Sequence, residues 1–159
     1  MSGLEVGEVV AERDVHLTRE SLVRYAGASG DFNPIHYRDD VAESMGLPGV
    51  LAHGMLTMGL AVETLVGWLG DSGRIIEYGV RFSKPVIVDL VEGAIVHVVA
   101  TVGAVDDDIA RIDLKVTHDT VTHDTVTHDT VTHDTVTHGT VEHGEIAVLG
   151  RAQVRIRLV

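Results

Sequence analysis

The chain has 159 residues, of which 45% are hydrophobic and 23% charged, with a formal net charge of −12 and no cysteine. A globular chain of this length buries about 70% of the surface that its unfolded form exposes, which suffices for one hydrophobic core. The absence of cysteine excludes a disulfide framework. The excess of acidic residues argues against nucleic-acid binding, which needs a concentrated Lys/Arg surface.

We expect neither a targeting segment nor a membrane-spanning segment in this sequence. Residues 1–12 contain no basic stretch that leads into an apolar run, so we predict neither a secretory signal nor a transit peptide. The one long apolar stretch, 54–69, is interrupted by polar residues and is shorter than the roughly 20 residues that cross a bilayer. We therefore expect a cytoplasmic protein without a membrane span.

The first predicted elements are short. A strand is expected near residues 6–15, followed by a helix that Thr18 caps and that Gly27 and Gly30 end. A second short helix is expected over 39–45, with its first aspartate as the cap. These elements precede the longest apolar segment of the chain.

Residues 54–69 form the longest predicted helix, and apolar side chains cover nearly its whole circumference. A helix that is apolar all round is typical of a buried helix. The pattern then changes to runs rich in β-branched residues, which predict antiparallel strands at 75–88, 93–105, 109–117 and 146–158. Together these elements predict an α+β fold in which an antiparallel sheet wraps around a long central helix, the hotdog architecture.

A five-residue repeat, Val-Thr-His-Asp-Thr, runs from Val116 to Thr135 and continues in two degenerate copies to Glu145. Because strand side chains alternate with a period of two, an odd unit turns each residue type to opposite faces in successive copies, so neither face can be a core face. We expect a single domain over residues 1–159, with an insertion at about 116–145 that forms an extended hairpin or a disordered loop.

Two clusters carry residues that chemistry could use. Asp31 and His36 lie five residues apart in a segment rich in Gly, Asn and Pro, where a bent loop can aim both side chains at one point, although a cap and a solvated histidine are the alternative. His53 and Gly54 open the long helix, whose first N–H groups lack intrahelical partners and can stabilise an oxyanion. The alternative is that Gly54 relieves packing and that His53 is a buried histidine with satisfied hydrogen bonds.

Together the clusters resemble the hydratase 2 motif of the MaoC-like family of (R)-specific hydratases and (3R)-hydroxyacyl dehydratases. The residues that match this motif are Tyr25, Ser29, Gly30, Asp31, Asn33, Pro34, Ile35, His36 and Ala42. The chain departs from the motif at Ala28, where the family has a larger aliphatic residue. The second family motif, His-Gly-Met, is matched at 53–55. The resemblance covers about 5–115 and 145–159 and leaves the repeat unexplained.

Within that family, residues 52–59, 68–71 and 77–82 resemble the catalytic β subunit of the actinobacterial (3R)-hydroxyacyl-ACP dehydratase. The resemblance implies a hydro-lyase that reversibly dehydrates (3R)-3-hydroxyacyl thioesters to trans-2-enoyl thioesters in fatty-acid or mycolic-acid elongation.

The resemblance also implies a role for each candidate residue. Asp31 and His36 hold the reacting water or hydroxyl, and the Gly54 N–H contacts the thioester carbonyl. Asn33 and His53 are assigned to substrate binding. Asn33 is expected to contribute by fixing the conformation of the loop that carries Asp31 and His36. No cofactor is implied. We expect no metal, because Asp31 and His36 alone, without Cys or His-Glu-x-x-His spacing, do not make a zinc site.

The family acts on acyl groups carried by acyl carrier protein or coenzyme A. A single hotdog unit offers half a binding tunnel, so the resemblance implies a homodimer or a heterodimer with a second hotdog subunit. Two alternatives are a homodimeric (R)-specific enoyl-CoA hydratase of degradation or polyester synthesis and a non-catalytic acyl-binding subunit. The intact acid and histidine pair argues against the non-catalytic subunit.

Basic residues alternate along two of the predicted strands. Arg81 on one strand and Arg151, Arg155 and Arg157 on another are expected to face outward, with Phe82 inward. This stripe is either the solvated face of the sheet or a surface that receives a phosphopantetheine arm.

Overall fold

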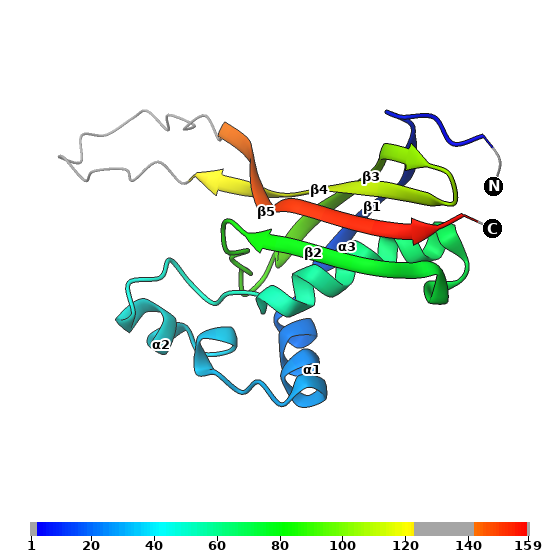
Figure 1. Cartoon of the computed structure of the whole chain (residues 1–159). Coiled ribbons are helices and arrows are strands. Elements are labelled where there is room, and N and C mark those ends of the chain that lie inside the picture. The colour runs from blue at the N-terminus through cyan, green and yellow to red at the C-terminus, as the bar shows by residue number, and fades with distance from the viewer. Residues whose placement is uncertain (1–2, 123–141, 159) are drawn as a thin grey trace.

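The computed structural model describes residues 3–122 and 142–158. Five strands form one antiparallel sheet in the order β1-β3-β4-β5-β2. They are β1 (Val9–Leu17), β2 (Ile75–Phe82), β3 (Ala94–Asp106), β4 (Ile109–Thr122) and β5 (Glu142–Arg157). The long helix α3 (Gly54–Leu69) packs on β1 and β3 along one face of this sheet (Figure 1). The predicted α+β hotdog architecture is confirmed.

Three shorter helices, α1 (Arg19–Ser29), η1 (Pro34–His36) and α2 (Asp39–Ser44), precede α3, and α1 and α2 lie near its start (Figure 1). The short helix η2 (Ser72–Arg74) follows the other end of α3. Thr18 caps α1 as expected, because its Oγ1 accepts the N–H of Ser21 at 3.3 Å. Gly30 ends α1 with φ of +77°, a conformation that glycine adopts without strain. The prediction that Gly27 ends the helix is wrong, since the α1 hydrogen bonds continue to Gly30.

The second short helix also differs from its prediction by one residue. Asp39 is the first residue of α2 and not its cap, which is Arg38. The carboxylate of Asp39 instead forms an ion pair with Arg19 at 2.7 Å, and this hydrogen bond lowers the pKa of Asp39. The acidic side chain therefore joins α2 to the start of α1.

None of the helices in the described part of the chain has the length and apolar character that a membrane span requires.

Helix α3 begins and ends at the predicted residues, but it is buried on one side only. The buried side chains are Thr57, Ala61, Thr64, Leu65 and Leu69. The opposite side exposes Met55 and Glu63, together with glycines. The predicted full burial is wrong for this chain, because the sheet covers one face of the helix and no described element covers the other.

The predicted strand 75–88 is interrupted. β2 ends at Phe82, and Pro85 lies in the irregular stretch that follows, as expected for a residue that lacks a ladder N–H. Residues 86–88 then pair with 50–52, directly before α3, through hydrogen bonds of 2.9 Å. Phe82 faces the start of α3, as expected, but it is 51% exposed, because β2 is an edge strand of the sheet. This arrangement brings Phe82 and the following loop to the start of α3.

The first copy of the repeat belongs to β4. Val116 and His118 lie opposite Val98 and Val96 of the core, and their exposed fractions are 1% and 5%. The expectation that neither repeat face is a core face is therefore wrong for this copy. Thr117 is 5% exposed as well, and the pairing of β4 with β5 is irregular at Val116. Residues 123–141 lie outside the described residues, so the predicted hairpin or loop stays a prediction.

The basic stripe lies on the outer face of the sheet. A hollow of about 360 Å³ there is lined by Arg81, Arg111, Arg151 and Arg155 among others. Arg155 pairs with Glu77 at 3.2 Å, and Arg111 pairs with Asp113 at 3.1 Å. The charges of Arg111 and Arg155 are thus balanced by acidic side chains of the same sheet face. This pattern is typical of a solvated surface.

Candidate active site

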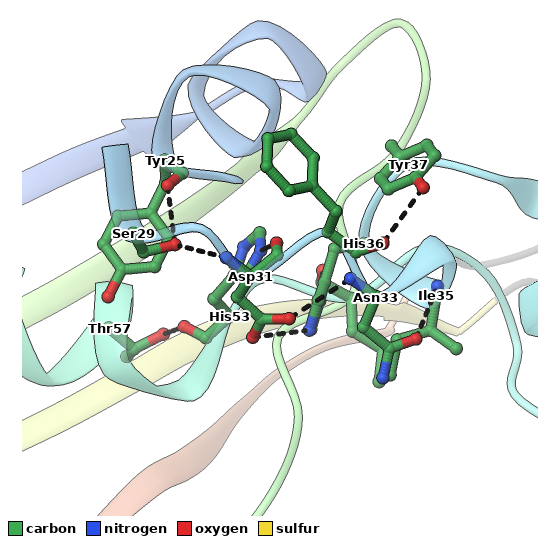
Figure 2. A network of polar contacts seen from close by, with 11 residues as sticks. Tyr25, Ser29, Asp31, Asn33, Ile35, His36, Tyr37, His53 and Thr57 are labelled. Atoms are coloured by element: carbon green, nitrogen blue, oxygen red, sulfur yellow. Dashed lines mark hydrogen bonds and ion pairs between the residues drawn. The ribbon is translucent and has the colours of Figure 1, made fainter. Parts of the chain in front are cut away.

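Asp31 lies in the loop between α1 and η1 (Figure 2). Three hydrogen bonds, each spanning two residues, shape this loop. The Asp31 N–H donates to Ser29 Oγ at 3.2 Å, the Asn33 N–H to Asp31 Oδ1 at 3.2 Å, and the Ile35 N–H to Asn33 Oδ1 at 3.3 Å. Such turns are typical of Ser, Asp and Asn side chains. They carry the chain from α1 into η1, where His36 is the last residue.

The loop brings the acid and the histidine together. Oδ2 of Asp31 lies 4.0 Å from Nε2 of His36. Because Oδ1 accepts the Asn33 N–H, Oδ2 is the oxygen that remains for a reacting group. His36 Nδ1 lies 2.8 Å from the carbonyl oxygen of Leu51, which can only accept, so Nδ1 carries the proton and Nε2 carries the lone pair in the neutral ring. The pair is therefore arranged to contact one oxygen atom from two sides.

His53 lies behind this pair and contacts both of its members (Figure 2). Its ring stacks on that of His36 with the centroids 3.7 Å apart and the planes at 23°. Its Nε2 donates to the main-chain oxygen of Asp31 at 3.1 Å, and the ring of Tyr25 packs on it at 4.9 Å. His53 is 2% exposed, and this burial lowers the pKa of its imidazole. Its observed contacts are to other residues of the site.

The three groups Asp31, His36 and His53 offer potential ligand atoms within 4.8 Å of one another. A metal ion must lie close to the plane of each imidazole that binds it, because the nitrogen lone pair lies in that plane. The stacked rings of His36 and His53 hold their lone pairs in nearly parallel planes. One nitrogen of each ring is also bonded to a main-chain oxygen. The geometry does not fit a shared ion.

A cavity of about 300 Å³ adjoins the acid and histidine pair. Its lining consists of His36, Leu51, Ala52, Gly54, Thr57, Phe82, Ser83, Lys84, Pro85, Val86 and Val148. The walls are mainly apolar, and the polar lining residues are His36, Thr57, Ser83 and Lys84, with the main-chain N–H of Gly54. Residues 82–86 were missed as a cavity wall by sequence reasoning, although Pro85 inside a predicted strand was the signal of a break.

Gly54 is the first residue of α3, and none of the described protein groups accepts its N–H. The N-terminus of a helix carries partial positive charge, which favours an oxyanion. A Cβ at this position would lie 3.2 Å from the Phe82 ring, so glycine permits close packing here. Asn33, the remaining predicted residue, caps η1 and does not line the cavity. The structure thus brings Asp31, His36, His53 and Gly54 together, with Asn33 supporting their loop.

The sequence was compared with known families and structures. A sequence profile described as "MaoC like domain" matches residues 4–122, three quarters of the chain. The chain belongs to the MaoC-like family. This confirms the resemblance that the motifs at 25–42 and 53–55 indicate.

Relatives within the MaoC-like family include 3-hydroxyacyl-thioester dehydratase X of Mycobacterium tuberculosis, 37% identical over 79 residues. The match covers 50% of this chain and 27% of that protein. A solved MaoC-like dehydratase is 30% identical with a TM-score of 0.79, over 98% of this chain and 41% of that one. This chain thus matches less than half the length of either relative.

Another solved structure matches this chain over its whole length. The solved (R)-hydratase from A. caviae, described as involved in PHA biosynthesis, has a TM-score of 0.71 over all of both chains. Its identity to this chain is 22%, so the likeness shows the fold that the two share.

Proposed function

We propose that this MaoC-like chain is a hydro-lyase that reversibly dehydrates (3R)-3-hydroxyacyl thioesters to trans-2-enoyl thioesters. One observation carries the proposal: Oδ2 of Asp31 lies 4.0 Å from Nε2 of His36, and His36 and Gly54 both line one mainly apolar cavity. The activity in the name of the M. tuberculosis relative, a 3-hydroxyacyl-thioester dehydratase, supports this class of substrate.

Dehydration needs a base for the proton on C2 and an acid for the hydroxyl on C3. His36 Nε2 carries the lone pair and takes the C2 proton, and the carboxylate of Asp31 stabilises the resulting imidazolium. The imidazolium then gives this proton to the C3 oxygen as the C–O bond breaks, which releases water and forms the C2–C3 double bond. Asp31 Oδ2 accepts a hydrogen bond from the departing hydroxyl. Because Asp31 and His36 lie 4.0 Å apart and together serve C2 and C3, the proton and the hydroxyl leave from the same face of the substrate.

The third requirement is a place for negative charge. Loss of the C2 proton gives the thioester oxygen enolate character, and the Gly54 N–H at the positive end of α3 stabilises it. The apolar walls of the cavity hold the acyl chain and exclude water, which strengthens both electrostatic contacts.

The first candidate is a dehydratase that acts on acyl-carrier-protein thioesters in fatty-acid or mycolic-acid elongation, paired with a second copy or with a second hotdog subunit. The side of α3 that the sheet leaves uncovered exposes Met55 and Glu63 together with glycines, and it offers that subunit a surface on which to pack. The second candidate is a homodimeric (R)-specific enoyl-CoA hydratase. The A. caviae (R)-hydratase, which has the same fold over the full length of both chains, is the reason to test this candidate.

The test measures hydration of crotonyl-CoA and of the matching acyl-carrier-protein thioester by the chain alone and with a candidate partner. Asp31→Asn and His36→Gln should each lower turnover at least about a hundredfold, the usual loss for a positioned acid or base. Both variants should stay folded, because Asn keeps an oxygen for the Asn33 N–H. A higher kcat/KM on one carrier decides between the two candidates.

The outer face of the sheet offers a matched control. Asp14 and His97 form an acid and histidine pair at 2.6 Å, away from the cavity. Asp14→Asn and His97→Gln should leave turnover unchanged. Near-native turnover in a folded Asp31→Asn or His36→Gln variant would refute the assignment.

A further inference from the structure

We infer that His53 is a positioning residue that, as a neutral imidazole, holds the Asp31 main chain and the His36 ring in their reacting geometry without touching substrate. The inference rests on the proposed function, and it assigns His53 a role other than the substrate contact that the family resemblance implies. Three observations carry it: the contacts of the ring, its electrostatic state and the rigidity of its own backbone.

The ring touches both members of the reacting pair. It lies face to face with His36 at 3.7 Å, which sets the plane in which the Nε2 lone pair of His36 points. Its Nε2 donates to the Asp31 main-chain oxygen at 3.1 Å, which holds the peptide that carries the carboxylate. His53 does not line the cavity and is 2% exposed, so a substrate in the cavity has no surface of this ring to contact.

The second observation is electrostatic. Burial lowers the pKa of His53, and a positive charge on His36 lowers it further, whereas the hydrogen bond to the Asp31 main chain and the Asp31 carboxylate oppose these effects. Besides the His36 ring, the ring of Tyr25 packs on His53. Proton uptake by His36 requires a neutral His53 ring. A positive charge on His53, with its ring centroid 3.7 Å from that of His36, would oppose formation of the His36 imidazolium.

The backbone of His53 is held as well. His53 precedes α3 in an extended conformation, and its carbonyl oxygen accepts the N–H of Thr57 at 3.2 Å and the hydroxyl of Thr57 at 3.4 Å. The first turn of α3 therefore anchors the residue, while Tyr25 of α1 packs on its ring. A rigid support of this kind keeps the two reacting groups in register.

Two substitutions separate the two contacts of the ring. His53→Gln keeps an N–H donor for the Asp31 oxygen and removes the stacked ring. His53→Phe keeps a stacked ring and removes the donor. In both we expect kcat to fall about 10- to 100-fold with KM unchanged, because a misplacement of about 1 Å costs up to about 10²-fold. His16→Gln is the matched control, since His16 also donates to a main-chain oxygen, that of Glu92 at 2.8 Å, outside the site.

A second readout does not depend on activity. In the wild type the ring of His53 shields the ring protons of His36, so the His36 signals, assigned by their loss in His36→Gln, should move downfield in His53→Gln. The inference is refuted if a folded variant keeps kcat, if the loss appears in KM, or if the His36 signals do not move. A wild type without activity on any enoyl thioester would overturn the proposed function, while the chemical shifts would still test the geometry.

Discussion

Replacing Gly54 by proline should abolish one interaction and leave the rest of the site in place. Proline is tolerated in the first turn of a helix, where its missing N–H has no intrahelical partner. The residue before a proline must be extended, and His53 already has φ of −60° and ψ of 131°. Gly54→Pro therefore removes the proposed oxyanion donor while the hydrogen bonds within α3 persist.

The expected loss follows from the role of that N–H. Deletion of one oxyanion donor lowers turnover about 10²- to 10³-fold, or roughly 3 to 4 kcal/mol in the activation barrier. The added carbon atoms also meet Phe82, because a Cβ on Gly54 would lie 3.2 and 3.3 Å from two atoms of its ring. Phe82 is 51% exposed, so its ring can move aside at modest cost.

Gly54→Ala is the matched control for this contact. Alanine adds the same Cβ against Phe82 but keeps the N–H, so its activity measures crowding alone. We expect kcat of the proline variant to lie at least about tenfold below that of the alanine variant, with equal secondary structure by circular dichroism. Equal kcat values in two folded variants would show that the N–H stabilises no charge, and Gly54 would then serve packing only.

Two further outcomes concern the rest of the chain. Deleting residues 121–140 joins Thr120 to Val141 and leaves three residues between the paired Thr120 and Gly144, which is a common hairpin loop length. The melting temperature and the turnover should therefore stay nearly unchanged. An unfolded deletion variant would contradict this prediction. The hydrogen bond to Asp14 raises the pKa of His97, so this contact stabilises the fold below about pH 6.5 and the stabilisation is lost as pH rises through the folded-state value. The free energy of unfolding should therefore fall more in His97→Gln at about pH 5.5 than at about pH 8.5, and a difference independent of pH would count against the assignment.

The ends of the long helix were predictable because its signals are local. An apolar run between His53 and the C-cap Gly70, whose φ is +74°, marks both ends of α3. Its one-sided burial was not predictable, because burial depends on which surfaces the sheet covers. The same reason explains Phe82, whose exposure follows from the place of β2 at the edge of the sheet.

The site divides in the same way. The spacing of Asp31, Asn33 and His36 identified a loop that the structure builds from contacts between near neighbours in sequence. The stack of His53 on His36 and the bond from His36 to the Leu51 oxygen join segments that the fold brings together. Residue spacing carries no information on such contacts, so the sequence left the orientation of His36 undetermined.

The short bonds of the Asp31 loop also affect how the site assembles during folding. The hydrogen bonds that the N–H groups of Asp31, Asn33 and Ile35 donate each join residues two positions apart. They therefore order only a short piece of chain, and such contacts form on the timescale of local turns. These local bonds therefore add little to the entropic cost of the site, and most of that cost lies in bringing His53 to this loop. The direction of the carboxylate depends on contacts within its own segment, whereas the ring plane of His36 depends on a contact with a distant one.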